Sequence, residues 1–254
     1  MRNQLAIALV AALCGCASLP PVQTDHLALT TDEYQTLIDA AHRPAADVAR
    51  DVDRKPAELM QFAEILPGEK VGDEMMGGGY LTRVEAAVVG PKGHVYAYQP
   101  DEFIAFRAAY ADDQKAIAAA LANVTAVNGP LLAQPYPVPL DTIITVQNFH
   151  DLYLKDRPPG TPEKVAANMF AALKPGGTLV VVDHRANPGD TNSPNEFHRI
   201  EKDRVIKVVE AAGFKLDAES DMYANPQDPH DISVFNKAIR GHTDQFALRF
   251  RKPG

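Results

Sequence analysis

The sequence predicts an α/β domain built on a mostly parallel sheet with helices on both faces. Strand-like and helical segments alternate along its 254 residues, which is typical of repeated strand–helix–strand units. The run Thr178 to Asp183 is nearly continuous in β-branched residues and lacks an in/out pattern, as in strands buried on both faces. Gln245 to Phe250 alternates instead, with no helix directly before it, so this last strand can enter antiparallel.

The composition fits one domain with a substantial core. Of all residues 46% are hydrophobic, and the formal net charge is -8. An acidic balance argues against a nucleic-acid partner, because phosphate binding needs clustered Lys and Arg. We therefore expect a small-molecule partner and no nucleic acid, while the sequence does not indicate the oligomeric state.

The first 16 residues read as a targeting segment. Met1-Arg2-Asn3-Gln4 precedes an apolar stretch from Leu5 to Leu13, as in secretory signals. Leu13-Cys14-Gly15-Cys16 resembles a lipoprotein lipobox, which makes Cys16 the expected lipidation site and the lipid the only membrane contact. The alternatives are a plain signal peptide or a start that is never exported. We expect a location in the cell envelope, facing the periplasm, or in the cytoplasm if the signal is not used.

After the signal, residues 17–43 read as a tether with a peripheral helix that begins at a capping box, Thr31-Asp32-Glu33-Tyr34. Residues 44–254 read as one domain without internal repeats. Its first helix is expected from Pro44 to Leu66, where Pro67-Gly68 ends it. Further helices are expected at 80–89, 101–122, from Thr161 onward and at 198–212, with strands at 69–73, 94–98, 124–127, 141–146, 178–183, 214–221 and 245–250.

A glycine-rich stretch, Val71-Gly72-Asp73-Glu74-Met75-Met76-Gly77-Gly78-Gly79-Tyr80, connects the first strand to a helix. Glycine tolerates positive φ and carries no Cβ, so main-chain N–H groups in such a loop can approach a ligand at a helix N-terminus. We interpret it as a cofactor loop. The alternative is an ordinary strand-to-helix turn.

The order of motifs resembles that of class I S-adenosylmethionine-dependent methyltransferases, in particular a bacterial group of small predicted methyltransferases. The resemblance covers Pro44 to the C-terminus. It implies a Rossmann-like, seven-stranded sheet with the last strand antiparallel and the cofactor across the C-terminal strand ends. The motifs are the glycine stretch, Gly90-Pro91-Lys92-Gly93, Val95-Tyr96-Ala97, Gln147-Asn148-Phe149-His150-Asp151, Leu173-Lys174-Pro175-Gly176-Gly177, Val182-Asp183-His184-Arg185, His198-Arg199-Ile200 and Arg240-Gly241-His242-Thr243-Asp244-Gln245-Phe246.

The resemblance also implies which residues contact S-adenosylmethionine. The methionine part would lie against the glycine loop, the ribose at the end of the second strand, and the adenine after the third. Met75 stands where the family has a glycine, and Gln99 where it has an acid; Asp101 or Glu102 could substitute for that acid. The expected cofactor-binding residues are Asp73, Gly77, Gly78, Gly79, Gln99, Asn128 and Gln147.

Methyl transfer needs an aligned nucleophile and, for many acceptors, a base. We expect His150 as general base, oriented by Asp151, with Asn148 beside them. The alternative is that Asn148 and His150 only tie the loop to the backbone. No HExxH or similar ligand pair is present, so no metal is expected. Substrate contacts are expected from Phe149, Asp183, His184 and His198.

The leading hypothesis is thus a methyltransferase acting on an unidentified small molecule. A protein facing the periplasm would find little S-adenosylmethionine, which favours a second hypothesis: a membrane-tethered, non-catalytic binding or accessory protein that keeps the fold. A dinucleotide oxidoreductase agrees less well, because the loop is not GxGxxG.

Overall fold

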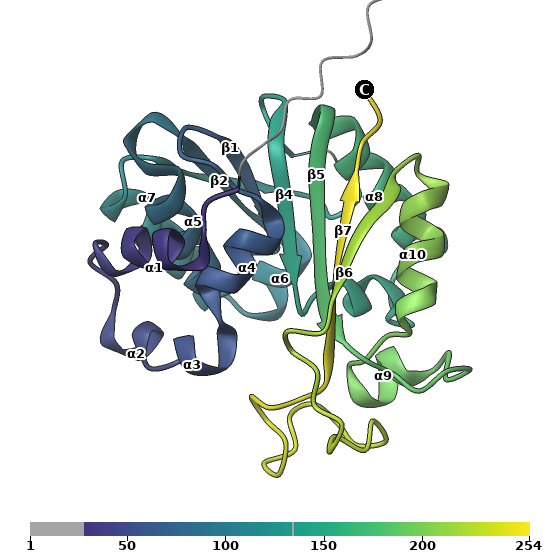
Figure 1. The fold of residues 1–254 in the computed structure, drawn as a ribbon. Helices are drawn as coiled ribbons and strands as arrows, with labels where there is room; N and C mark the ends of the chain where they lie inside the picture. Colours follow the sequence, from purple (N-terminus) through teal and green to yellow (C-terminus); the bar gives the residue numbers. More distant parts are fainter. Residues whose placement is uncertain (1–27, 134) are drawn as a thin grey trace, which may run out of the picture.

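The computed structural model describes residues 28–133 and 135–254. The expected signal segment and Cys16 lie outside the described residues. The described chain forms one seven-stranded sheet in the order β3-β2-β1-β4-β5-β7-β6 (Figure 1). The strands are β1 (Lys70–Glu74), β2 (His94–Pro100), β3 (Val124–Gly129), β4 (Leu140–Val146), β5 (Leu173–His184), β6 (Lys215–Ser220) and β7 (Gln245–Arg251).

The strand directions confirm the expected fold class. β1 pairs parallel with β2 and β4, while β7 runs antiparallel between β5 and β6. The chain order reverses between β1 and β4, since β2 and β3 lie on one side of β1 and β4 to β7 on the other. In open α/β sheets, ligands bind beside such a reversal, at the carboxyl ends of the strands.

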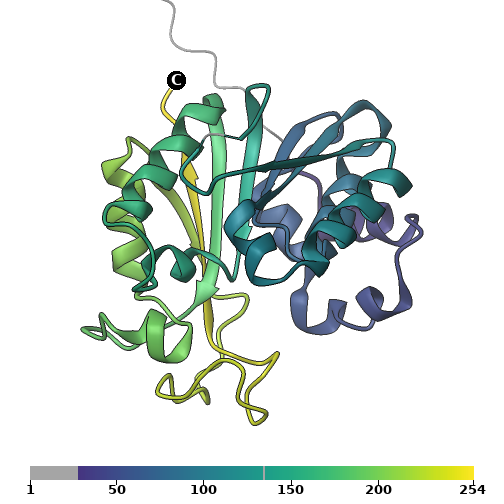
Figure 2. The ribbon, with the colours of Figure 1, turned by 180° about the vertical axis from the view of Figure 1, so that it is seen from behind.

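Helices cover both faces of the sheet (Figure 1 and Figure 2). β5 shows why the sequence lacks an in/out pattern: Val180 and Val182 belong to one hydrophobic core, whereas Leu179 and Val181 belong to the other. Successive strand residues face opposite sides, so a strand between two helical layers is apolar throughout. One layer contains α1 (Thr31–Asp39), α4 (Pro56–Ala63) and α5 (Tyr80–Val89); the other contains α8 (Thr161–Ala172) and α10 (Lys202–Ala211).

The N-terminal helices differ from the expectation. The single helix expected over 44–66 is three, α2 (Ala45–Val48), α3 (Asp51–Arg54) and α4. Lys55 adopts a left-handed conformation (φ 42) before Pro56 and separates the last two. The capping box lies one residue earlier, at Thr30 with Glu33. The helix α1 is also not peripheral, since Tyr34 is fully buried and donates a hydrogen bond to the carbonyl of Ile65 (2.8 Å).

Two further expected helices differ from the expectation, one by being divided and one by beginning later. The long one over 101–122 consists of α6 (Asp101–Phe106) and α7 (Ala109–Ala120). The one expected to begin at His198 begins instead at Lys202, because His198 adopts a left-handed conformation (φ 56) at the end of α9 (Ser193–Phe197). Two short 3-10 helices complete the chain, η1 (Gly90–Lys92) and η2 (Phe149–Tyr153).

A long connection, residues 221–244, joins β6 to β7 at the carboxyl edge of the parallel strands (Figure 1). Arg199 and Asp228 anchor it through a pair of hydrogen bonds of 2.9 Å each, and both side chains are completely buried. The Asp228 carboxylate also accepts the N–H groups of His230 (3.1 Å) and Asp244 (2.7 Å). The connection is thus held to the sheet by a fully paired buried charge.

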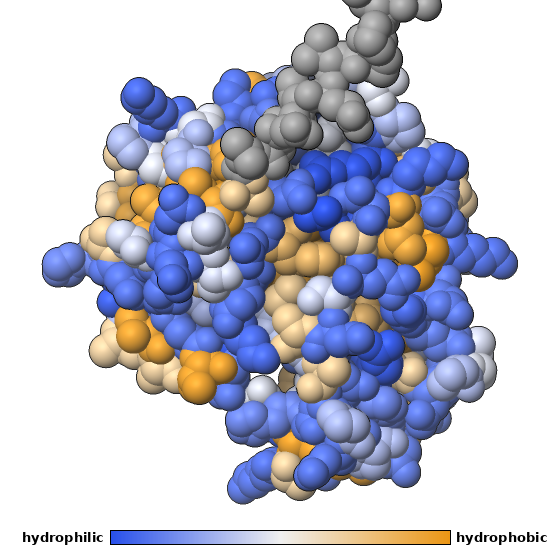
Figure 3. All heavy atoms as spheres, viewed as in Figure 1, coloured by the Kyte–Doolittle hydropathy of each residue, from blue (hydrophilic) through white to orange (hydrophobic). Residues whose placement is uncertain are grey.

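Among the described residues, no helix has the length and apolar character needed to cross a membrane. The face seen in Figure 3 is mostly hydrophilic, with separate hydrophobic patches. It is hollowed between the region of α3 and the 221–244 connection (Figure 3).

Candidate active site

The glycine loop borders two cavities at the carboxyl edge of the sheet. Gly77 lies in the left-handed region (φ 57), and a Cβ built on it would meet no atom within 4 Å. It lines both cavities, which have volumes of about 170 and 490 Å³. The absence of a side chain at Gly77 therefore leaves open space beside the cavities rather than relieving a contact inside the protein.

Gly79, in contrast, is needed for packing. A Cβ on this residue would come within 2.0 Å of Ile117 Cδ1 on α7, and its φ is 75. Gly79 precedes α5 as its N-cap and is buried, and neither cavity includes it. Of the three glycines expected to contact a cofactor, Gly77 and Gly78 face the smaller cavity, whereas Gly79 sets the distance between α5 and α7.

Met75 takes the backbone conformation that a glycine would adopt without strain. Its φ is 61, in the left-handed region that most side chains avoid. The side chain is buried in the core with Tyr98 and Tyr136 and also lines both cavities. Met75 thus combines a backbone conformation that favours glycine with apolar contacts in the core.

Gln99 is placed differently from the expected ribose contact. Its Oε1 accepts the N–H of Gly77 (2.9 Å), so this oxygen closes the loop against the end of β2. Its Nε2 is buried without a hydrogen-bond partner among the described residues. The Gln99 oxygen that was expected to accept from the ribose is therefore already hydrogen-bonded, and only the Nε2 donor of this residue has no partner in the described part of the chain.

Two other residues near the end of β2 were candidates for cofactor contacts in the sequence, and only one of them lines either cavity. Asn128, expected near the adenine, donates to the carbonyl of Gln99 (3.2 Å) and to Gln114 Oε1 (2.8 Å), and it lines neither cavity. Glu102 is exposed, lines the 490 Å³ cavity, and accepts the N–H of Leu131 (2.9 Å). Glu102 is thus the carboxylate available for hydroxyl groups here, as the sequence allowed.

The residues present fit S-adenosylmethionine, on two observations. The open space at Gly77 and Gly78 admits an amino acid group, and Asp73, buried on the same cavity, supplies an acceptor for an ammonium. Burial raises the pKa of Asp73 to about 7, although Thr82 donates a hydroxyl hydrogen bond to it (2.5 Å). Gln99 also lines the 490 Å³ cavity and has a buried Nε2 without a partner in the described chain, and Glu102 supplies an acceptor there.

His150 lines the 490 Å³ cavity and is hydrogen-bonded to a buried carboxylate. Its Nδ1–H donates to Asp183 Oδ1 (2.8 Å), and its backbone N–H donates to Asp183 Oδ2 (2.7 Å). Both residues are buried, Asp183 completely. Asp183 thus orients His150, a role expected of Asp151, and being fully enclosed it does not contact a substrate.

The charges around His150 favour an imidazole that accepts a proton. Burial alone lowers its pKa, but the charge and hydrogen bond of Asp183, with a smaller effect of Asp151, raise it above the ordinary value. Burial opposes ionisation of Asp183, yet His150 holds the pKa of this carboxyl below its usual range. With Nδ1 committed to Asp183, the free lone pair of His150 is on Nε2.

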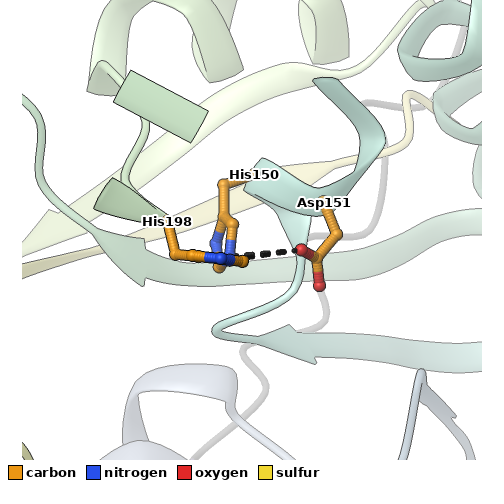
Figure 4. Close-up of side chains that lie close together, drawn as sticks. All are labelled: His150, Asp151 and His198. Atoms are coloured by element: carbon orange, nitrogen blue, oxygen red, sulfur yellow. Dashed lines mark ion pairs between the residues drawn. The ribbon is translucent and has the colours of Figure 1, made fainter. Parts of the chain in front are cut away.

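The 3-10 helix η2 and the residue after α9 bring Asp151 and His198 to this lone pair (Figure 4). Asp151 Oδ1 lies 3.4 Å from His150 Nε2 and 3.8 Å from His198 Nδ1. The ligand atoms of the three residues lie within 4.8 Å of one another, so the cluster has the chemistry to hold a divalent ion. No spacing in the sequence pointed to this cluster, because His198 is 47 positions from Asp151 and reaches it only through its left-handed backbone conformation.

If the protein transfers methyl groups with His150 Nε2 as the base, this nitrogen cannot also ligate a metal. We therefore expect dialysis against EDTA to leave methyl transfer unchanged, and zinc ions to inhibit by occupying Nε2. Radiolabel transfer measured before and after chelation, and with added zinc, checks this. His198→Ala should weaken the zinc inhibition, whereas loss of activity on chelation would identify the cluster as a required metal site.

The remaining expected residues have distinct positions. The Asn148 amide donates to the carbonyls of Met75 (3.1 Å) and Val146 (2.8 Å), which joins the ends of β1 and β4 and agrees with the structural alternative. Phe149 is fully buried in the core, so it does not contact a substrate. His184 lines the cavity, but burial lowers its pKa to about 3, so it is neutral.

Gln147 lies where three cavities meet. It borders the two cavities described above and a third of about 470 Å³, and its φ of 63 is strained. Gln147 Nε2 donates to Gln245 Oε1 (3.0 Å), and Gln147 Oε1 accepts from Arg54 (3.2 Å). The third cavity lies between α3 and the 221–244 connection, and no motif in the sequence indicated that these segments would meet.

The strand order and the loop after β1 identify the fold. The strand order with one antiparallel strand, and the glycine loop between β1 and α5, form the class I S-adenosylmethionine-dependent methyltransferase fold. No protein-family model matches the chain. The solved structure of an S-adenosylmethionine-dependent methyltransferase from Aquifex aeolicus superposes with a TM-score of 0.57 at 18% identity, covering 88% of this chain and 99% of that one.

Two further comparisons bear on function. Ubiquinone/menaquinone biosynthesis C-methyltransferases (UbiE) from two strains of Vibrio vulnificus are 28% identical over 184 residues, which is 72% of this chain. The chain spans 62% of the length of these relatives. The [4+2]-cyclase SpnF has the same fold, with a TM-score of 0.55 at 19% identity, covering 84% of this chain and 83% of that one. The fold alone therefore does not specify methyl transfer.

Proposed function

We propose that the protein is an S-adenosylmethionine-dependent methyltransferase that acts on a small molecule. One observation carries the proposal: Gly77, with open space where a side chain would lie, borders both the cavity beside the loop after β1 and the larger cavity that His150 lines. The likeness to the Vibrio C-methyltransferases supports methyl transfer as the reaction.

The loop residues would hold the cofactor by its amino acid part. Gly77 and Gly78 admit this part, Asp73 accepts from its ammonium, and Arg54, which borders the same cavity, pairs with its carboxylate. Glu102 and the free amide of Gln99 would bind the ribose in the neighbouring cavity. When bound, the cofactor supplies an electrophilic methyl group on a sulfonium.

The protein's own contribution is alignment and proton removal. The acceptor would lie between Gln147 and His150, with its nucleophilic atom toward the sulfonium. Nε2 of His150 takes the proton that the acceptor loses, and Asp183 stabilises the resulting imidazolium through Nδ1–H. The Phe235 and Val234 side chains border the cavity from the 221–244 connection and reduce the access of water.

Substitution of Gly77 tests the cofactor site directly. Gly77→Ala places a methyl group in this open space, so we expect the dissociation constant for S-adenosylmethionine to rise by about tenfold or more. Isothermal titration of the full chain measures it. Gly160→Ala is the matched control, because Gly160 also has positive φ (82) and open space around it, yet lies outside these cavities. Equal affinities in the two variants would contradict the assignment.

A non-catalytic binding protein is the second candidate. The engagement of Gln99 Oε1 by the loop favours it, because the ribose then lacks the acceptor that the family places there. The two candidates differ in one readout. An enzyme transfers tritium from methyl-labelled S-adenosylmethionine into a bacterial small-molecule extract, whereas a binding protein binds the cofactor and transfers none.

A further inference from the structure

The 470 Å³ cavity carries a positive charge in a protein that is negative overall. Three arginines line it, Arg50, Arg54 and Arg240, with a single acid, Asp53. His184 also lines it and is neutral, since burial lowers its pKa to about 3. The charges that border this cavity sum to +2, against -8 for the chain.

The neighbouring 490 Å³ cavity has the opposite sign. Its acids are Glu102, Asp151 and Asp156, and its one guanidinium is that of Arg157. An anion entering the edge of the sheet is therefore attracted to the 470 Å³ cavity and repelled from the other. The two cavities share Gln147, so a molecule in the positive cavity reaches the place where the methyl group would be transferred.

Of these three arginines only Arg50 has a carboxylate partner among the described residues, with Asp47 Oδ1 3.9 Å from its Nη1. Arg54 is half-buried, and no carboxylate there lies within 4.0 Å of its guanidinium or of that of Arg240. Arg50 and Arg54 both stack on the Tyr80 ring, with guanidinium carbons 4.9 and 5.1 Å from its centroid. Burial and the charge of Arg50 together lower the pKa of Arg54, so the two cations repel each other and an anion between them is favoured.

The cofactor is not this anion, because its net charge is positive. S-adenosylmethionine has one carboxylate, one ammonium and one sulfonium, so its net charge is +1. Its carboxylate would pair with Arg54 at the smaller cavity, while Arg240 borders only the 470 Å³ cavity of these three. Binding of the cofactor leaves the positive cavity with a larger excess of positive charge.

We propose that the methyl acceptor is a small anion, such as a carboxylate, with an apolar or aromatic body. Arg240 and Arg50 bind its charged group, and the body packs on Leu59, Tyr80 and Tyr223, which line the same cavity. The assignment rests on the proposed methyltransferase function. It restricts the acceptor to a chemical class that neither the fold nor the relatives specify.

Matched acids and amides test the charge requirement. The full chain is first saturated with S-adenosylhomocysteine and then titrated by calorimetry with two pairs, 4-hydroxybenzoate against 4-hydroxybenzamide and phenylacetate against phenylacetamide. We expect an acid to bind about tenfold more tightly than its amide. Arg240→Gln should remove this preference and leave affinity for S-adenosylhomocysteine unchanged. The control, Arg107→Gln, alters an exposed arginine that borders none of the three cavities and should change neither.

Three results would overturn the proposal. They are equal binding of acids and amides, no binding of any of the four compounds, and a preference for the acids that survives Arg240→Gln. A failure of the first step is separate, because a chain that does not bind S-adenosylhomocysteine refutes the methyltransferase function itself. Arg54→Gln separates the two anions, since it should weaken cofactor binding whereas Arg240→Gln should not.

Discussion

Replacing His150 with alanine is expected to lower kcat by about 10² to 10⁴-fold, the usual contribution of a general base. The variant loses the Nε2 lone pair that faces the cavity, while the cofactor contacts at Gly77 and Glu102 remain. Methyl transfer to an acceptor that the wild type methylates measures the loss, and titration with S-adenosylhomocysteine should give an unchanged affinity. Full activity in the variant would leave His150 with the structural role that the sequence also allowed.

Because the Asp183 carboxylate raises the pKa of His150, the rate of methyl transfer should also depend on pH. If His150 is the base, the reaction needs its neutral imidazole, so the rate should fall as the pH drops through the raised pKa of this residue. In Asp183→Asn the charge that raises this pKa is absent and burial lowers it. The acid limb of the kcat/KM profile should then move to lower pH, with a smaller maximum because Nδ1–H is less firmly held. A limb that stays in place would show that another group controls the rate.

The second large effect concerns stability. Asp228→Ala is expected to lower the free energy of unfolding by about 3 to 5 kcal/mol, because it leaves the Arg199 guanidinium buried without its partner. Urea denaturation measures the change. Glu219→Ala is the matched control, since its ion pair with Lys202 is exposed and contributes about 1 kcal/mol or less. Similar losses in the two variants would contradict the role assigned to the buried pair.

The stabilisation by Asp228 should also depend on pH. Burial raises the pKa of its carboxyl, but hydrogen bonds from Arg199 and the N–H groups of Asp244 and His230 lower it below the ordinary value. The contribution is thus fully present above the unfolded pKa of about 3.9 and is lost as the pH falls through the folded one. The difference in stability between the wild type and Asp228→Ala should therefore narrow in acid.

The sheet was predictable from the sequence because its signals are local. The apolar run in β5 and the alternation in β7 each follow from which faces are buried. Helix boundaries were predicted less well, because single backbone conformations decided them. Lys55 and His198 adopt positive φ, and no residue type at these positions requires it.

The candidate site was predictable in part. The loop around Gly77 and the cluster at His150 lie at strand ends, where the motif order placed them. The partner of His150 was not predictable, since Asp183 is 33 positions away and only the parallel pairing of β4 with β5 makes them adjacent. The same holds for the positive cavity, whose arginines come from α3 and from the 221–244 connection.

The glycine loop and the adjacent strand ends are proposed to bind the cofactor of a methyltransferase. A crystal structure of the protein with S-adenosylhomocysteine tests it most directly. We predict the amino acid part of the ligand at Gly77 and Gly78, with its carboxylate toward Arg54 and its ribose hydroxyls at Glu102. A ligand bound elsewhere, or crystals in which millimolar ligand leaves this edge unchanged, would contradict the claim.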